Sequence, residues 1–186
     1  ALVNPFGRRL SLGYDAAGRL NTVTDPATQV YTYAYDAAGN LSTISYPDDT
    51  PADATDNPKK TYLYEDSRFP RHLTGILDEN GQRYATYAYD AQGRGISTEH
   101  AGGAQRLRFE YLDADTTRVF ENLDGTREYA RDYDHARYNG ADTITGIAFP
   151  ACTDCTIGSG QETYRYDSAG HLDTATDKRG LVTDYD

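Results

Sequence analysis

The sequence lacks several of the residues with which a compact protein normally builds its interior. It has no Met and no Trp, and Leu, Ile, Val and Phe together account for only 29 of its 186 residues. With a net charge of −11, so apolar-poor a chain has the composition of a disordered protein. The 17 Tyr argue against disorder, because disordered chains are poor in aromatic residues and Tyr favours strands. The composition therefore predicts a β protein whose buried surface is built from tyrosine.

Positive charge and long apolar runs are also scarce. Lys and Arg number 18 against 29 Asp and Glu, which argues against nucleic acid and anionic membrane surfaces as partners. No run approaches the roughly 18 apolar residues of a membrane span, so we expect no membrane insertion. The chain has neither an initial Met nor a leader-like segment. We therefore expect it to be a processed product or a fragment of a longer protein.

A Tyr-Asp-x-x-Gly motif recurs along the chain, first at a spacing of 21 residues. Its clean copies are Tyr14-Asp15-Ala16-Ala17-Gly18, Tyr35-Asp36-Ala37-Ala38-Gly39, Tyr89-Asp90-Ala91-Gln92-Gly93 and Tyr166-Asp167-Ser168-Ala169-Gly170. Degenerate copies are expected at Tyr64-Glu65, Tyr111-Leu112 and Tyr133-Asp134. A fixed period of this length is typical of repeat architectures, in which each unit packs on its neighbours.

The motif has the chemistry of a tight turn. An Asp before two small residues accepts backbone N–H groups, and the Gly three residues later takes a positive φ. Similar signals lie halfway between the copies, at Asn4-Pro5-Phe6-Gly7, Asp25-Pro26-Ala27-Thr28, Asp78-Glu79-Asn80-Gly81 and Asp177-Lys178-Arg179-Gly180. Each repeat is therefore predicted to contain two turns separated by short segments.

The segments between turns are rich in Tyr, Thr and Val, which favour strands. Tyr31, Tyr33 and Tyr35 alternate, so all three should lie on one face of a strand. The pattern predicts an all-β array of antiparallel hairpins in one sheet. After the Gly, however, Leu20 and Val23 are three residues apart, which indicates a β-bulge or a bend.

These repeats resemble the Rhs/YD-repeat family, which includes bacterial polymorphic toxins and, more distantly, the animal teneurins. The resemblance implies that residues 1–186 form one repeat domain, whose curved or spiralling sheet is part of a hollow shell. It also implies flanking Rhs repeats and an enclosed toxin domain as partners, and a secreted or cell-surface location in bacteria. The family's core-closing Asp-Pro-x-Gly-type segment and a following toxin domain are not found here, so the resemblance implies no self-cleaving or toxic activity.

Cys152 and Cys155 are the only two cysteines. We expect a local disulfide that clamps a loop, with free thiols and a metal site as the alternatives. A structural zinc site needs four ligands, and the four His residues (72, 100, 135 and 171) are scattered singly. We therefore expect no metal.

Carboxylate pairs are the remaining candidates for chemistry. The pairs Asp48-Asp49, Asp113 with Asp115, and Asp132 with Asp134 could suggest a glycosidase, but 29 acidic residues explain such pairs by chance. One Asp per turn is too sparse for calcium repeats, which favours turn capping instead. No nucleophile-elbow, phosphate-loop or zinc-protease motif is present. We expect no enzyme, no catalytic residue and no cofactor.

Two functions follow as hypotheses. The leading one is structural: a segment of a β-shell that encapsulates a toxin cargo. The alternative is an exported cell-surface or fibre-forming module that binds carbohydrate by stacking on tyrosines, or adheres to a partner. Unpaired strands at the two ends of such an array would also favour self-association.

Overall fold

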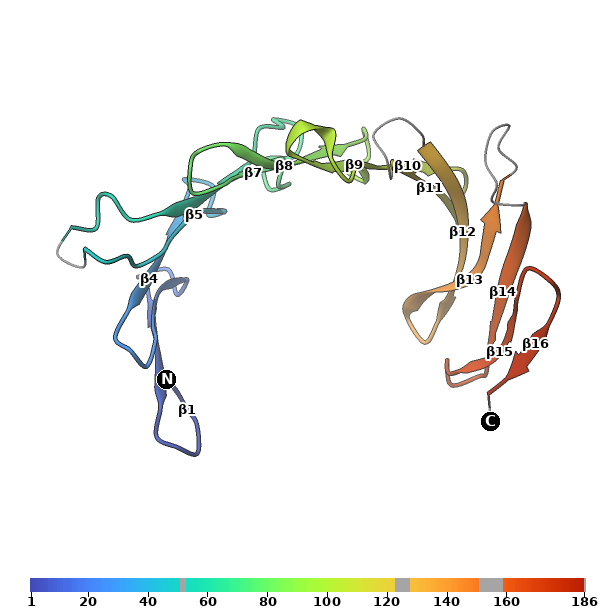
Figure 1. Ribbon diagram of the computed structural model, residues 1–186, viewed down its shortest axis with the longest axis horizontal. Helices are drawn as coiled ribbons and strands as arrows, with labels where there is room; N and C mark the ends of the chain where they lie inside the picture. Colours follow the sequence, from blue (N-terminus) through green and yellow to red (C-terminus); the bar gives the residue numbers. More distant parts are fainter. Residues whose placement is uncertain (51–52, 123–127, 151–158, 186) are drawn as a thin grey trace. The chain divides into compact units, whose positions relative to one another are not determined.

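The computed structural model describes residues 1–50, 53–122, 128–150 and 159–185. These residues contain sixteen β-strands and no α-helix, and the only helical element is a single 3-10 turn, Ala101–Gly103. The predicted all-β, antiparallel fold is therefore confirmed. The chain divides into two compact units, Ala1–Gly93 and Arg94–Asp186, each described below by itself (Figure 1). The single-domain assignment stays a prediction.

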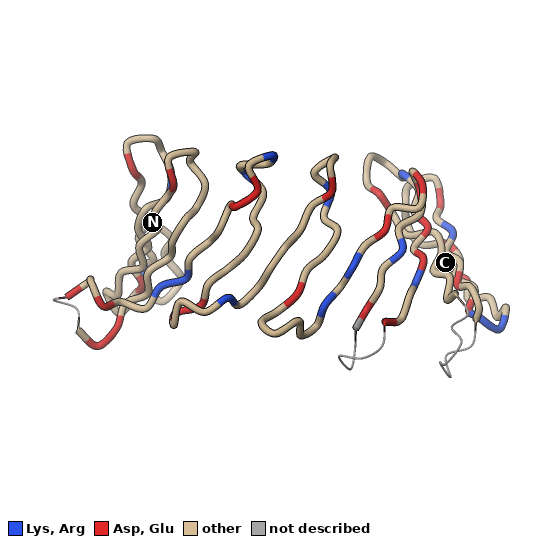
Figure 2. Tube along the Cα trace, turned by 90° about the horizontal axis from the view of Figure 1, so that it is seen from above, with Lys and Arg blue, Asp and Glu red and all other residues tan. Residues whose placement is uncertain are grey.

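The first unit is a meander of antiparallel strands. Its strands are β1 (Leu2–Val3), β2 (Arg9–Tyr14), β3 (Leu20–Thr24), β4 (Val30–Tyr35), β5 (Leu41–Ser45), β6 (Lys59–Leu63), β7 (Gly75–Leu77) and β8 (Arg83–Tyr89). Each strand pairs with the next one in the sequence. None of these strands contains Asp or Glu, so the acidic residues of this unit lie in its turns and loops (Figure 2).

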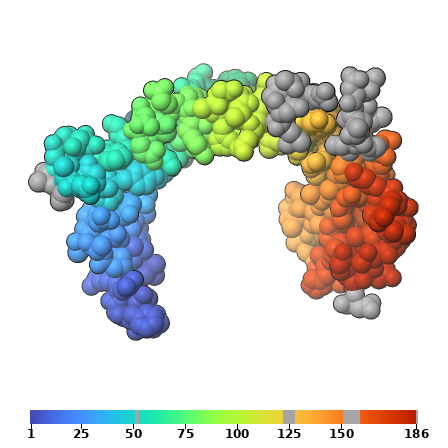
Figure 3. All heavy atoms as spheres, in the orientation of Figure 1, coloured from blue at the N-terminus to red at the C-terminus, as the bar shows by residue number. Residues whose placement is uncertain are grey.

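The second unit repeats this topology with longer and more charged strands. They are β9 (Gly95–His100), β10 (Leu107–Tyr111), β11 (Thr116–Asn122), β12 (Glu128–Tyr138), β13 (Ala141–Phe149), β14 (Gly160–Tyr166), β15 (Leu172–Thr176) and β16 (Val182–Asp184). Again each strand pairs antiparallel with its sequence neighbours. In the space-filling view the colours change in sequence order along each unit, as this topology requires (Figure 3).

The sheet of each unit is a single layer with almost no core. Among the described residues only Thr74, Gly75, Ala85 and Gly146 are buried, and Ala85 is the only one with an apolar side chain. The accessible surface is 12380 Å², whereas a compact protein of this mass exposes about 8,900 Å². Cross-strand pairs and turns, rather than a second layer packed against the sheet, must therefore hold the strands together.

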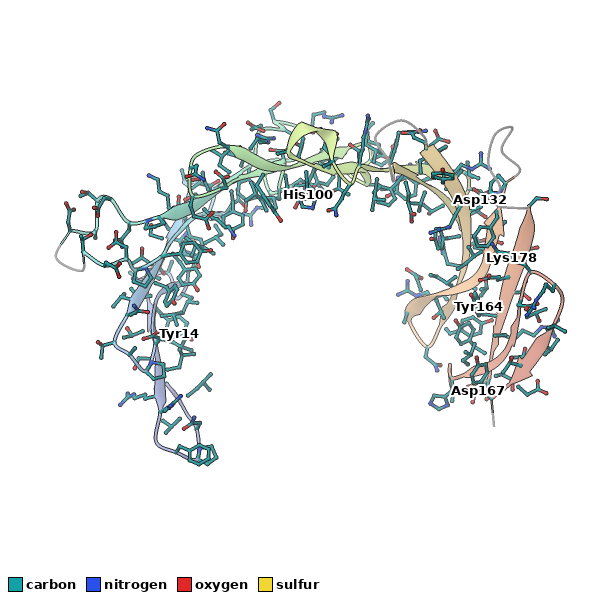
Figure 4. All side chains as sticks on the ribbon, in the orientation of Figure 1. Tyr14, His100, Asp132, Tyr164, Asp167 and Lys178 are labelled. Atoms are coloured by element: carbon teal, nitrogen blue, oxygen red, sulfur yellow. The ribbon has the colours of Figure 1, made fainter. Side chains whose placement is uncertain are left out.

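The two faces of the first unit differ in chemistry. Registered pairs such as Val23 with Tyr31 and Tyr33 with Ile44 place most of the large apolar residues on one face. We define this tyrosine face by Leu12, Val23, Tyr31, Tyr33, Ile44, Tyr62, Ile76 and Ala85. The opposite face carries hydroxyl residues, including the directly paired Thr22 and Thr32. Side chains stand on both faces of the sheet (Figure 4).

In the second unit, cross-strand ion pairs lie on both faces of the sheet. Arg118 lies directly opposite Asp132, and the Arg118 Nε–Asp132 Oδ1 distance is 2.6 Å. Arg108 pairs with Glu128 across the same face at 3.1 Å. The other face carries Phe109, opposite Val119, and a further ion pair between Arg131 and Glu121 at 2.9 Å. Apolar and charged residues therefore share each face in this part of the second unit.

The bulge expected after the motif glycine is confirmed. Tyr14 pairs with Leu20 whereas Gly13 pairs with Thr22, which leaves Asn21 as the extra residue. Leu20 and Val23 therefore share a face although they are three residues apart. The same shift occurs between Ala34 and Tyr35 in the next copy.

One degenerate copy was assigned wrongly. Tyr133 and Asp134 lie in the middle of β12, where Tyr133 pairs with Thr117 and with Ile147. The turn occurs five residues later, at Asn139 and Gly140, which have φ of 49° and 85°. An Asn-Gly pair readily adopts such values, and this outweighs the weak Tyr-Asp signal.

Candidate functional site: the repeat turns and their tyrosines

Each motif aspartate organises its turn through one carboxylate oxygen. Asp15 Oδ1 accepts the backbone N–H groups of Ala17 and Arg19, both at 2.9 Å. The backbone adds two bonds, from Gly18 N to Asp15 O and from Asp15 N to Arg19 O. Gly18 has φ of 76°, a conformation that L side chains rarely adopt. Five residues are thus closed into one compact loop.

Turns at the other edge of the sheet use the same bonds. Asn4, Asp25, Asp78 and Asp177 each accept two backbone N–H groups on one side-chain oxygen. The positive-φ position is Gly in three of these turns and Thr28, with φ of 68°, in the fourth. The motif residues Asp36, Asp90 and Asp167 also accept backbone N–H groups in their turns. Gly39, Gly93 and Gly170 have φ of 84°, 79° and 87°.

These hydrogen bonds favour the ionised aspartates. The backbone N–H of Arg19 is the main group that lowers the pKa of Asp15 below its ordinary value. The side-chain amide of Asn40 does most to lower the pKa of Asp36, and the backbone N–H of His171 does so for Asp167. The turns are therefore predicted to be most stable when their aspartates are charged.

In every motif after the first, the tyrosine holds the preceding repeat by its hydroxyl. Tyr35 Oη donates to the backbone carbonyl of Leu20 at 2.8 Å. The same bond recurs from Tyr64 to Leu41, Tyr89 to Leu73, Tyr111 to Gly95 and Tyr166 to Ile144, at 2.7 to 3.0 Å. We call these bonds the tyrosine staples.

The staples lie where the backbone ladder ends. The β3–β4 ladder pairs Thr22 with Thr32, and no further pair is formed toward the motif turn. If the β3–β4 register continued toward the turn, Leu20 would lie opposite Ala34, which is the residue before Tyr35. The Tyr35 hydroxyl thus takes the place of a missing ladder bond to the Leu20 carbonyl. A half-buried carbonyl without a partner would be costly, so the hydroxyl is needed there.

Arginine after the motif glycine covers the next tyrosine ring. The Arg19 guanidinium lies 4.4 Å from the centroid of the Tyr35 ring and also bonds Asp15 at 2.8 Å. Arg94 lies in the same way 4.0 Å from the centroid of the Tyr111 ring. These arginines therefore link one turn to the staple of the following repeat.

A longer loop, residues 64–74, replaces one motif turn and contacts the turns on both sides. Asn40 Nδ2 donates to the carbonyl of Pro70 at 2.8 Å. On the other side, Arg68 donates to the carbonyl of Tyr89 at 3.2 Å, and the His72 ring lies 4.7 Å from the Tyr89 ring. This loop connects three successive repeats along one edge of the first unit.

The carboxylates that the sequence offered as candidates for catalysis or metal binding lie in different environments in the described part of the chain. Asp132 is paired with Arg118, and Asp113 bonds the backbone of Asp115 in a turn. Among the described residues no three His, Cys, Asp or Glu side chains form a group that could hold a metal. In the same part of the chain no helix is long and apolar enough to cross a membrane. Cys152 and Cys155 lie outside the described residues, so their disulfide stays a prediction.

Sequence reasoning located the turns but missed the staples and the connecting loop. The hydroxyl acceptors are 15 to 23 residues from their tyrosines, so no local pattern shows them. One signal was available: the clean motifs use Tyr rather than Phe at their first position. In Figure 4, Asp167 marks the β14–β15 turn and Lys178 marks the β15–β16 turn, with Tyr164 of β14 between them.

Comparison with known families identifies these repeats. The family model described as RHS Repeat matches residues 1–30 and 14–51. Residues 1–51 match RHS repeats. The resemblance seen in the motif residues is thereby confirmed, and the same turn geometry recurs beyond the matched segment. A search of curated proteins finds no match.

Solved structures show the same fold over most of the chain. A crystal structure of TcdB2-TccC3 without its hypervariable C-terminal region matches 95% of this chain, with a TM-score of 0.54 and 15% identity. The structure of TcdB2-TccC3-TEV matches 94%, with a TM-score of 0.52 and 16% identity. The matches span only 10% and 9% of those longer chains. At this identity the likeness shows the fold.

Proposed function

We propose that this chain is a wall segment of a hollow shell that encloses a toxin cargo. The observation that carries the proposal is the single-layer sheet, in which only four of the described residues, Thr74, Gly75, Ala85 and Gly146, are buried. Catalytic sites need side chains held rigidly by supporting groups. A wall needs continuous strand pairing instead, and the ladders, turns and staples supply it.

The RHS repeats support this proposal. In the Rhs/YD-repeat family that the motifs resemble, such repeats build a shell around a C-terminal toxic domain. One structural neighbour is described as lacking a hypervariable C-terminal region, which is consistent with a shell that carries variable cargo. The proposal places the chain in an exported bacterial protein, between flanking repeats of the same kind.

A protease-protection experiment tests the proposal. The full-length protein that contains this segment is digested alongside its C-terminal domain expressed alone. Enclosure predicts that the domain is cut at least tenfold more slowly within the full-length protein. Equal digestion rates would refute enclosure. A full-length variant in which residues 94–186 are deleted opens the wall and should restore rapid digestion.

The adhesive alternative makes an opposite prediction for the chain alone. Adhesion through tyrosine stacking requires saturable binding of neutral glycans by the 186-residue chain. The shell proposal expects no such binding, and the guanidinium groups of Arg19 and Arg94 already cover the rings of two staple tyrosines, Tyr35 and Tyr111. A glycan array probed with the chain separates the two functions.

A further inference from the structure

A groove of about 440 Å³ lies in the first unit, between two neighbouring turns at one edge of the sheet. One wall comes from the turn that Asn4 caps and from the start of β2, and the other from the turn that Asp25 caps. The side chains that line it are those of Phe6, Arg8, Arg9, Ser11, Thr24, Asp25, Pro26 and Thr28. None of these residues belongs to a staple.

The two arginines of this groove differ from most others in the chain. Arg19, Arg68 and Arg179 each have a carboxylate oxygen within 2.8 Å. Among the described residues, by contrast, no ion pair is formed by Arg8 or Arg9, although acidic residues outnumber basic ones by 29 to 18. The guanidinium groups of Arg8 and Arg9 are therefore not neutralised by a paired carboxylate, and they leave a local excess of positive charge in the groove.

The other groups of the groove suit the same kind of ligand. Asp25 is its one carboxylate, and its Oδ1 is occupied by the backbone N–H groups of Ala27 and Gln29. The hydroxyls of Ser11 and Thr24 form no hydrogen bond within the described part of the chain and can donate to a ligand. Phe6 is 88% exposed, which leaves its ring open to an apolar group.

We propose that this groove binds a small phosphate or sulfate ester that carries an apolar or aromatic group. Tetrahedral oxyanions offer three or more oxygens, enough for both guanidinium groups and a hydroxyl, whereas a carboxylate offers two. The ring of Phe6 packs against the ester group. A polyanion such as nucleic acid is disfavoured, because the net charge of −11 repels it over its length.

Titration of the isotope-labelled chain with phenyl phosphate, phenyl sulfate and inorganic phosphate, followed by NMR, tests this proposal. Saturable shifts confined to residues 6–11 and 24–28 are expected, and phenyl phosphate should bind more tightly than inorganic phosphate. The comparison of phenyl phosphate with phenyl sulfate distinguishes the two esters. Binding should weaken as salt is added, because both arginines are exposed.

Substitutions identify the groups responsible. Arg8→Gln and Arg9→Gln should each weaken phenyl phosphate binding by about two- to fivefold, as expected for exposed ion pairs. Phe6→Ala should reduce the preference for phenyl over inorganic phosphate. Arg165→Gln is the matched control, since Arg165 is also exposed and lies outside the groove. Equal weakening by the control, shifts scattered over the chain, or no saturation at high millimolar ligand would overturn the proposal.

Discussion

Tyr35 Oη donates a 2.8 Å hydrogen bond to the carbonyl of Leu20, fifteen residues earlier in the chain. Leu20 is the first residue after one motif turn, and Tyr35 is the first residue of the next motif. The bond therefore joins successive repeats at the point where their backbone ladder ends. In a sheet with so little core, such local ties should contribute a larger share of stability than in a compact domain.

Removal of one staple should have a measurable effect. Tyr35→Phe deletes only the hydroxyl, and we expect a loss of about 1 kcal/mol in the free energy of unfolding. Urea unfolding followed by circular dichroism measures it. The matched control is Tyr14→Phe, since the Tyr14 hydroxyl has no hydrogen bond within the described residues and its side chain is 59% exposed. An equal loss in both variants would contradict a role for the staple.

Thr28 holds the positive-φ position that glycine holds in the turns capped by Asn4, Asp78 and Asp177, and glycine should improve this turn as well. Thr28 has φ of 68°, a conformation strained for a β-branched residue. Thr28→Gly should relieve this strain and stabilise the chain by about 1 kcal/mol, after the entropy cost of glycine. Thr28→Ala serves as the control, because it removes the side chain but keeps a Cβ, and should gain less. Thermal unfolding compares the variants, and an unstable Thr28→Gly chain would show that the turn is not strained.

Replacement of a motif glycine by a β-branched residue should destabilise the folded chain. Gly18 has φ of 76° and open space around the position of a Cβ, so a substitution there is strained without a steric clash. Gly18→Val should destabilise the chain by about 1–3 kcal/mol. Ala17→Val, at the preceding exposed position, should have a much smaller effect. Similar melting temperatures for the two variants would argue against this origin of the strain.

Acid should weaken the turns. The pKa values of Asp15, Asp36, Asp167 and Asp177 are lowered in the folded chain by hydrogen bonds. Their contribution to stability is therefore complete above the unfolded pKa of about 3.9 and is lost as the pH falls through the lower folded values. The urea midpoint, measured from pH 7 to pH 2.5, should fall most steeply below about pH 4.

Asp15→Asn provides the control for this acid effect. The amide keeps an oxygen that can accept the N–H groups of Ala17 and Arg19, as Asn4 does in its own turn. The variant should lose part of the acid dependence and remain folded at neutral pH. An unchanged acid profile would mean that Asp15 does not titrate as proposed.

The local parts of this structure could be predicted from the sequence. An Asp with a Gly three residues later specifies its own turn, and the three-residue spacing of Leu20 and Val23 showed the bulge. The turn and the bulge depend on hydrogen bonds between residues at most about ten positions apart, so a short sequence pattern includes both partners. The alternation of Tyr31, Tyr33 and Tyr35 likewise predicted one face of a strand.

Other features depend on register, which no short pattern shows. The staple of Tyr64 reaches Leu41 across an intervening loop, so its acceptor is known only once β5 and β6 are paired. The loop at 64–74 contacts turns on both sides through Asn40 and Arg68, and neither partner is near in sequence. Tyr133 was misassigned because a Tyr-Asp pair without a following Gly is equally compatible with the middle of a strand.

Native-state hydrogen exchange on the wild-type chain and on Tyr35→Phe tests the central claim that each repeat is held mainly by its neighbours. Each strand pairs only with the strands adjacent to it in sequence. Loss of the Tyr35 staple should therefore speed amide exchange in β3 and β4 and leave β14 and β15 unchanged. A uniform increase along the whole chain would contradict the account, because it would mean that the repeats share one cooperative core.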